Sequence, residues 1–461
     1  MLHSLVLFTF LLLGTLTLPF LVLQKPAPRT SLRGEFEDAL ASLNKQQNSL
    51  KSFSQESGTK FVVPNGIGIG TLSWGDKKRG FTTKTKITKK YKNANPGVYN
   101  AGDLSLVYST LTKAGIRFVD TSEIYGLSSL SSGQSSEELI GKFGDIDLEG
   151  IATVKGTKIS WSWMNFMGRR GSSGILKAIQ DSCDRLSVGY VDLYQVPFPF
   201  PYIGGQRKII KGLKLARDRG LTNHFGVANL NGKKLMSMAK LFASQDLEIA
   251  SNQIEFRCVT SAAEHLVRLF IHSSPSLPPS LPPSLHPFIH SSIHPFIHPF
   301  TRPSISSLLN RKAMFDGTLE TCKRLGIVVL AAKPLGGGLA CGKYTAMNPT
   351  GGKIGTPKYS FNELDPLSPL HNALRQVAIM VQSRLKDEHD SAEKNLRKNF
   401  PVPEITTSMV AINWVVAKGA VPLCGVSRND EANEVVDCLG WKLSSAELER
   451  LDDACDEMEG R

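Results

Sequence analysis

Two side chains that can hold and move a proton stand five residues apart in this chain. Asp120 closes the apolar run 116–119, and Tyr125 follows it. The run is typical of a buried strand, and Ser135-x-x-Glu138 downstream is a capping box that predicts the start of a helix. In a parallel α/β protein, this strand-to-helix edge is where ligand sites are built. A carboxylate and a phenol are therefore expected together at such an edge.

A tyrosine beside a lysine and a carboxylate can act as a general acid. A free tyrosine has a pKa near 10, which is too high for an efficient acid at neutral pH. A nearby lysine cation lowers that pKa, and an aspartate paired with the lysine holds the cation in place. Asp120, Tyr125 and a lysine at the end of the next strand would form this relay. Such a relay suits the reduction of a carbonyl, whose oxygen needs a proton donor. A tyrosine at this spacing is otherwise a packing residue, so the rest of the chain must decide.

Short apolar runs alternate with longer helical patterns from Phe61 onward, which predicts repeated βα units and a parallel sheet. Eight such runs fit a closed barrel. The expected strands are 67–72, 117–121, 150–154, 190–196, 224–227, 249–254, 327–332 and 421–425. The helices between them carry apolar stripes expected to pack on the sheet, namely Ile175, Ile179 and Cys183, and Met409, Ile412 and Val416.

One stretch, residues 266–314, interrupts this alternation. It contains repeated Ser-Leu-Pro-Pro units and two copies of His-Pro-Phe-Ile-His. A segment so rich in Pro and Ser forms no regular structure, so we expect a disordered insert, which slowly growing loop-closure entropy permits. Its histidines are candidate metal ligands. However, the short repeat resembles translated low-complexity nucleotide sequence, so no metal site is expected, and a retained intron or gene-model error is an alternative origin.

The first residues predict a targeting leader. Residues 5–23 are almost wholly apolar, and the continuation carries Arg and Ser but no acidic residue before Glu35. We expect a signal peptide over 1–24, with a membrane anchor as the alternative, and a targeting or linker segment over 25–60. This pattern suits a bipartite address to a plastid, with an endomembrane or membrane-anchored location as the alternative. Contact with a membrane is expected only if the leader is retained.

Cysteine usage and charge exclude several classes of protein. The seven cysteines are scattered and odd in number, which argues against a disulfide framework or zinc site and favours a reducing compartment such as a plastid stroma. Part of the net charge of +13 is concentrated in eight Lys and Arg residues within 77–92. We interpret this cluster as a solvated loop, with steering of a polyanionic cofactor as the alternative. No nucleic-acid-binding motif accompanies it, so no nucleic-acid partner is expected.

The segment from Phe118 to Gly126 resembles the active-site segment of the aldo-keto reductases. The segments 192–197, 226–229 and 251–256 also resemble that family, and the resemblance runs from Gly66 to about Asp453 apart from the insert. It is greatest to chloroplast members from plants and algae. It implies a (β/α)8 TIM barrel within residues 61–461. It also implies an NADPH-dependent oxidoreductase that reduces a small aldehyde or ketone by hydride transfer, with Tyr125 as proton donor.

Two positions depart from the pattern of the family. Its Ala-Thr-Lys corresponds to residues 152–155, with one extra residue before the lysine, so Lys155 is the expected catalytic lysine and Lys158 the alternative. The family usually has a histidine at the end of the fourth strand, where this chain has Pro197. Proline offers neither a side-chain donor nor a backbone N–H. The alternative function is therefore an NADPH-binding regulatory or redox-sensing barrel with little or no turnover.

The resemblance places the nicotinamide at the ends of three strands. Asn229 and Gln253 would bond its carboxamide, and Phe256 would stack on its ring. Gly70 and Thr71, at the end of the first strand, are the other expected cofactor contacts on this side. No G-x-G-x-x-G follows a strand, which argues against a Rossmann dehydrogenase.

The phosphate groups of NADPH are expected at the last two strands. Lys333 and Leu335 precede the glycine run 336–338, whose small residues let backbone approach a diphosphate while Lys333 adds charge. Ser427 and Arg428 stand at the start of a helix through Glu434, a natural site for the 2′-phosphate, and Glu434 completes the expected contacts. The alternative for Arg428 is an exposed surface charge. The oligomeric state and the particular carbonyl substrate do not follow from the sequence.

Overall fold

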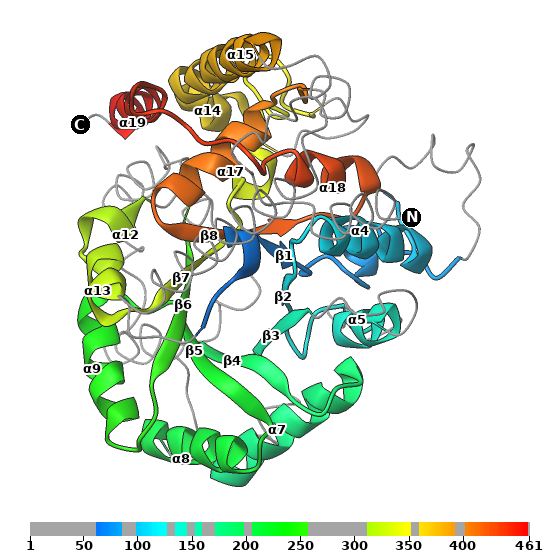
Figure 1. Ribbon diagram of the computed structural model, residues 1–461, viewed down its shortest axis with the longest axis vertical. Coiled ribbons are helices and arrows are strands. Elements are labelled where there is room, and N and C mark those ends of the chain that lie inside the picture. Colours follow the sequence, from blue (N-terminus) through cyan, green and yellow to red (C-terminus); the bar gives the residue numbers. More distant parts are fainter. Residues whose placement is uncertain are drawn as a thin grey trace, which may run out of the picture.

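The computed structural model describes residues 61–84, 98–126, 134–144, 153–158, 171–197, 205–256, 311–351, 359–391 and 402–459. Its strands form a closed parallel barrel in sequence order, β1 to β8, as Figure 1 shows. The strands are β1 Gly68–Gly70, β2 Phe118–Asp120, β3 Val154–Lys158, β4 Val191–Pro197, β5 Thr222–Ala228, β6 Ile249–Glu255, β7 Val328–Ala332 and β8 Ala420–Gly425. The expected (β/α)8 TIM barrel is confirmed. The expected leader and linker, 1–60, and residues 266–310 of the expected insert lie outside the described residues.

Helices follow the strands and surround the barrel (Figure 1). The α-helices are α4 Ala101–Lys113, α5 Ser136–Gly144, α7 Gly171–Leu186, α8 Gly205–Asp218, α9 Gly232–Ala243, α12 Lys312–Phe315, α13 Thr318–Leu325, α14 Phe361–Leu364, α15 Ser368–Ser391, α17 Thr407–Ala417, α18 Asn429–Val436 and α19 Ser445–Glu459. Short 3-10 turns are η1 Pro64–Gly66, η2 Lys77–Arg79, η4 Gly336–Gly338 and η5 Asp365–Leu367. The expected stripe of α7 is fully buried, and Met409 and Ile412 of α17 are buried as well.

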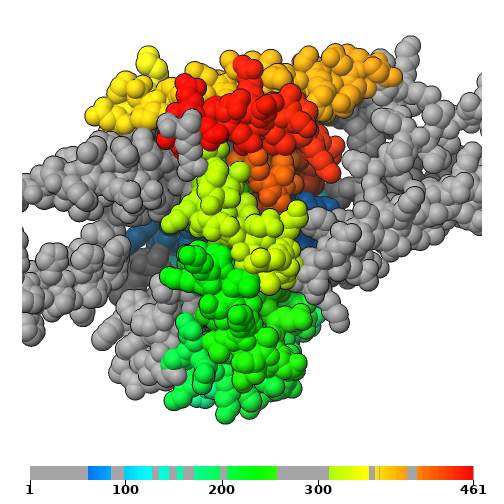
Figure 2. All heavy atoms as spheres, turned by 90° about the vertical axis from the view of Figure 1, so that its left-hand side faces the viewer, coloured from blue at the N-terminus to red at the C-terminus, as the bar shows by residue number. Residues whose placement is uncertain are grey.

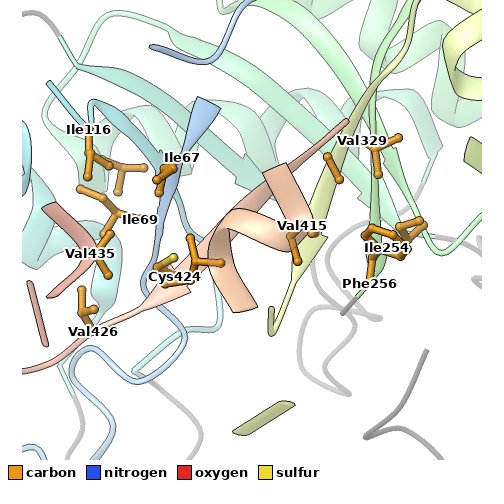
Figure 3. Packing of buried hydrophobic residues seen from close by; sticks show 14 of the residues in the cluster. Ile67, Ile69, Ile116, Ile254, Phe256, Val329, Val415, Cys424, Val426 and Val435 are labelled. Atoms are coloured by element: carbon orange, nitrogen blue, oxygen red, sulfur yellow. The ribbon is translucent and has the colours of Figure 1, made fainter. Parts of the chain in front are cut away.

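Alternation along each strand separates two apolar cores. Residues that point into the barrel fill its lower part. Residues that point outward pack beneath the helices, and Figure 3 shows some of the side chains of this outer core. The inner cluster comprises Phe61, Val63, Phe118, Leu193, Ala250, Leu330 and Leu423. Because the inner cluster ends at this level, the inward positions nearer the carboxyl ends of the strands are left to polar groups.

The third strand lies further along the chain than the sequence pattern predicts. It was expected over 150–154 but spans Val154–Lys158, paired with β2 through Val119↔Lys155 and Asp120↔Gly156. The helix expected after Ser135 does begin at Ser136, yet the buried Ser135 hydroxyl has no hydrogen-bond partner in the described part of the chain. The capping box is therefore not formed, although the helix boundary is in the expected place.

The carboxyl-terminal helices close one side of the molecule. Figure 2 shows α19, in red, against α15, in orange, and these two helices are in close contact. The buried guanidinium of Arg311 pairs with Asp456 and Glu459 of α19, and α12 begins directly after it. Residues 311–314 thus belong to the fold, so the expected carboxyl boundary of the insert at 314 is wrong by a few residues.

The described residues contain no helix long and apolar enough to cross a membrane. Within the same residues no group of three or more His, Cys, Asp or Glu side chains is arranged to hold a metal ion. The six cysteines that the structure describes are free thiols.

Candidate active site

Asp120 lies at the centre of a polar cluster inside the barrel. Its carboxylate is 3% exposed at the end of β2 and accepts hydrogen bonds on both oxygens. Lys158 Nζ lies 2.8 Å from Oδ2. The amide nitrogens of Gln195 and Gln253 each donate to Oδ1 at 2.9 Å. A buried carboxylate needs such donors, because burying an unpaired charge is costly.

The lysine of this cluster is Lys158, and the prediction of Lys155 is wrong. Asp120 pairs with Gly156, so period-two alternation turns Lys158 to the same inner face as Asp120. Lys155 pairs with Val119, whose side chain belongs to the outer core, and its backbone N–H donates to the Asp192 carboxylate at 2.7 Å. The four-residue displacement of β3 is the physical cause, because it places Lys155 within the strand rather than at its end.

Tyr125 faces the ammonium group of Lys158. The Lys158 Nζ lies 5.1 Å from the centroid of the Tyr125 ring. Burial raises the pKa of the Tyr125 phenol above its ordinary value, and the nearby Asp120 charge adds to this, while Lys158 opposes both. The pKa of Lys158 is itself raised, because Asp120 and Tyr125 outweigh the effect of burial. The expected lowering of the tyrosine pKa is therefore opposed here by desolvation.

The end of β4 carries Pro197, which pairs with Ala228. None of the three histidines in the described residues takes the place of a donor there. His224 packs on Phe61 with ring centroids 5.5 Å apart, among the residues of the lower barrel. His371 is buried in α15 with Nε2 2.8 Å from the Leu339 carbonyl oxygen, and His389 lies near the end of α15.

Asn229 and Gln253 are brought together, as the sequence pattern predicts. Asn229 follows β5 in a left-handed conformation, with φ of 63°, and its backbone N–H donates to the Gln253 carbonyl at 2.9 Å. The Gln253 side chain also accepts from Lys158 Nζ at 2.7 Å. An amide can make up to four hydrogen bonds, so Gln253 retains capacity for a further donor and acceptor.

Phe256 does not lie where a stacking residue is needed. It is fully buried after β6 and stacks on Trp414 of α17, with ring centroids 5.5 Å apart and an angle of 29° between the rings. Figure 3 shows Phe256 beside Ile254 in the apolar core. Alternation along β6 turns Gln253 inward and Phe256 outward, so the prediction of ring stacking by Phe256 is wrong.

The end of β1 has a supporting role in this structure. Thr71 is fully buried, and its hydroxyl donates to the Asp120 carbonyl at 3.0 Å and accepts from Ser136 Oγ at 2.8 Å. Thr71 therefore joins β1 to β2 and α5 directly beneath the cluster. Gly70 pairs with Gly425 of β8, and a Cβ on Gly70 would come within 3.2 Å of the Leu423 carbonyl oxygen.

The expected diphosphate segment follows β7. Lys333 and the glycines of η4 adopt positive φ angles of 53°, 58°, 69° and 101°, a run that favours glycine. Lys333 Nζ pairs with Glu255 Oε1 at 2.6 Å, where it bridges the ends of β6 and β7. Leu335 packs against the outer core and its carbonyl accepts from the Gly338 and Ala340 N–H groups.

Ser427 and Arg428 stand immediately before α18, as expected, but two carboxylates of that helix already occupy their donors. Glu431 accepts from the Ser427 N–H at 2.9 Å and pairs with Arg428 Nη2 at 3.1 Å. Asp430 pairs with Arg428 Nε at 3.0 Å, which raises the pKa of the guanidinium and lowers that of Asp430. Glu434 instead accepts from the Thr406 hydroxyl.

Two residues of the site were not among those predicted. Gln195 could have been found by the period of two, because it stands two residues before Pro197 on the same face of β4. Glu431 carried no signal, because an acidic residue in the first turn of a helix is common. Only the folded helix shows that its carboxylate reaches back to Ser427.

A model of the aldo/keto reductase family matches residues 66–273 and 302–456. The chain belongs to the aldo/keto reductase family. This membership makes the protein an oxidoreductase and confirms the resemblance. The match is interrupted over residues 274–301, which fall inside the expected insert.

Particular relatives agree with this assignment. The chain is 24% identical over 400 residues to "Pyridoxal reductase, chloroplastic" of Arabidopsis thaliana, covering 85% of this chain and 83% of that protein. It is 28% identical over 158 residues to an aldo-keto reductase of Mycobacterium avium, covering 33% of this chain and 47% of that protein, so it spans about half of that relative. The solved structure of the glycerol dehydrogenase AKR11B4 from Gluconobacter oxydans matches with a TM-score of 0.51 at 16% identity, covering 86% and 93% of the two chains.

Proposed function

We propose that this aldo/keto reductase reduces an aldehyde or ketone with NADPH, and that Tyr125 donates the proton. The observation that carries the proposal is the position of Lys158, whose ammonium joins the buried Asp120 carboxylate to the Tyr125 phenol. Family membership supports the reaction class. NADPH, when bound, supplies the hydride.

The residues at the carboxyl ends of the strands fit this cofactor in part. The Asn229 and Gln253 segments suit a carboxamide, since Gln253 can make one further bond of each kind. The left-handed glycine run after β7 suits the close approach of a diphosphate. The fit is less complete at Arg428, because Asp430 and Glu431 already balance its charge.

The chain's own groups would handle the proton in a defined order. Tyr125 stays protonated at neutral pH because its pKa is raised, and it donates its proton to the oxygen of the carbonyl. The ammonium of Lys158 stabilises the phenolate that remains, and Asp120 holds the ammonium in place.

The substrate we favour is a small aldehyde in a plastid. A relative that matches over 85% of this chain carries the name of a chloroplastic pyridoxal reductase, and pyridoxal is an aldehyde. Pyridoxal is therefore the first compound to test in a panel of aldehydes and ketones. The signal peptide expected over 1–24 and the targeting segment expected over 25–60 agree with the same compartment.

The alternative is an NADPH-binding barrel with little or no turnover, and Pro197 favours it. A strand end with no side-chain donor provides one fewer group to orient the carbonyl. The two functions differ in a single measurable property, which is steady oxidation of NADPH in the presence of a carbonyl.

The test is NADPH oxidation by the full chain across the carbonyl panel, together with NADPH affinity by fluorescence titration. Tyr125→Phe should abolish oxidation and leave the affinity within about twofold, because only the hydroxyl is lost. Pro197→His should raise turnover, since a positioned acid–base group contributes about 10²–10⁴-fold. Turnover that survives Tyr125→Phe would refute the proton donor. Binding of NADPH without turnover in any variant would favour the alternative.

A further inference from the structure

Gln195 is a buried amide at the centre of the barrel with no role in the reaction described so far. Alternation along β4 turns it inward, and the register places it opposite Lys158 of β3. It is 0% exposed, and its Nε2 donates to Asp120 Oδ1 at 2.9 Å.

The barrel accommodates this amide at a cost in stability. A Cβ on Gly226 of the neighbouring strand would stand 2.9 Å from Gln195 Cγ and closer still to Ser251 Oγ, so the glycine provides the space. Gln195 Oε1 accepts no hydrogen bond within the described residues. A methionine in the same space would bury no such acceptor. The hydrogen bond to Asp120 is the contact that an amide provides at this position and a methionine does not.

The two amides that donate to Asp120 are not equivalent. Gln253 also accepts from Lys158 at 2.7 Å, and its strand end is the one assigned to the cofactor. Gln195 makes no second side-chain hydrogen bond in the described part of the chain. Gln195 can thus hold Asp120 in one orientation whether or not Gln253 engages another partner.

We propose that Gln195 is a positioning residue, whose amide fixes the Asp120 carboxylate so that Lys158 stays directed at Tyr125. The inference rests on the proposed function, in which this cluster serves the proton donor. Without the Gln195 N–H, less of the carboxylate charge is taken up by neutral donors, and Asp120 draws Lys158 toward itself. The phenol then loses part of its stabilising charge, and proton donation slows.

The test is Gln195→Met in the full chain, which keeps the length of the side chain but removes the donor. We expect kcat to fall about tenfold or more, while the Kd for NADPH changes less than about twofold. Two NMR signals of isotope-labelled protein at pH 8, Tyr125 ¹³Cζ and Lys158 ¹⁵Nζ, should both shift, and Tyr125→Phe and Lys158→Arg assign them. Gln376→Met, at an exposed glutamine of α15 that accepts from Arg450, is the matched control and should move neither signal.

The two NMR signals need no turnover, so the outcomes separate. If Gln195→Met folds cooperatively and both signals keep the parent's positions, the positioning role is overturned. If the parent reduces no carbonyl but the signals shift, the proposed function fails while the link from Gln195 to Lys158 and Tyr125 stands. Should Gln195→Met fail to fold, Gln195→Asn withdraws the amide by one methylene and should produce the same shifts.

Discussion

At the residue scale, two opposed effects act on the pKa of Tyr125. Burial disfavours the phenolate, whereas the ammonium of Lys158 favours it, and burial prevails so that the pKa is raised. The phenol therefore keeps its proton at neutral pH, and Lys158 lowers the free energy needed to remove that proton. The same lysine is held on its other side by Asp120 at 2.8 Å.

The raised pKa of Tyr125 predicts a particular pH dependence. In the proposed function, reduction requires the protonated phenol, which is the form present below its pKa, and that pKa lies above the ordinary value of 10.0. The kcat for carbonyl reduction at saturating NADPH should therefore stay level from about pH 7 to about pH 10 and fall only above that range. A fall in kcat of the parent between pH 7 and pH 9 would contradict this reasoning.

The choice between the two lysines of β3 can be tested directly. Lys158→Met should lower kcat by about 10²–10⁴-fold, because the phenolate loses the cation that lies 5.1 Å from the centroid of its ring. Lys155→Met is the matched control on the same strand, and its turnover should stay within about twofold of the parent. The reverse ranking of the two variants would restore the interpretation based on the sequence pattern.

At the element scale, strand register and helix termini decide which groups meet. Because β3 begins four residues later than expected, Lys158 rather than Lys155 lies at the carboxyl end of the strand. In the first turn of α18, the Glu431 carboxylate contacts the Ser427 N–H and the Arg428 guanidinium. The site expected for the 2′-phosphate therefore already holds a negatively charged side chain. The first effect follows from where a strand begins, which is the least certain part of a sequence pattern. The second follows from a side-chain contact made within a helix whose start was predicted correctly.

Removal of that negative charge should strengthen the binding of NADPH. Glu431→Gln removes the carboxylate charge that Ser427 and Arg428 share, although Asp430 still pairs with Arg428 at 3.0 Å, and charged hydrogen bonds to the 2′-phosphate contribute about 1.5–3 kcal/mol each. The Kd for NADPH should fall about tenfold or more, and the Kd for NADH, which has no such phosphate, should stay within about twofold. Fluorescence titration of both cofactors provides the measurement.

Asp437→Asn is the control for this experiment, because it removes one negative charge at the other end of the same helix. It should improve neither cofactor selectively. If Glu431→Gln lowers the Kd for NADPH and the Kd for NADH equally, the effect is one of general charge. That result would refute the assignment of the phosphate to Ser427 and Arg428.

At the scale of the whole molecule, the barrel accommodates an interruption between β6 and β7. The family match breaks between 273 and 302, while the described fold resumes at Arg311. There the buried guanidinium pairs with Asp456 and Glu459 of α19, so the return of the chain to the barrel is fixed by the carboxyl-terminal helix.

A pair of deletions tests where the interruption ends. A chain that lacks 274–301 should keep a cooperative thermal transition within about two degrees of the parent. A chain that lacks 274–314 should melt at a lower temperature than the shorter deletion, because it loses the buried Arg311 and leaves Asp456 and Glu459 without their partner. Loss of cooperative unfolding in the shorter deletion would show that residues 274–301 support the barrel.

The sequence by itself determined the architecture and the location of the candidate site. Period-two and helical patterns are local, so eight βα units could be predicted, and Asp120 and Tyr125 were correctly placed at a strand end. The neighbouring positions of Asn229 and Gln253 also followed, since the carboxyl ends of parallel strands meet at one edge.

Tertiary structure decided which side chains those strand ends present. Lys158 replaces Lys155, and Phe256 turns to Trp414, because register and alternation depend on pairing with strands far apart in the sequence. Gln195 and Glu431 enter the site for a similar reason. Each is defined by a partner that only folding brings within hydrogen-bond distance, Asp120 across the barrel and Ser427 across a helix turn.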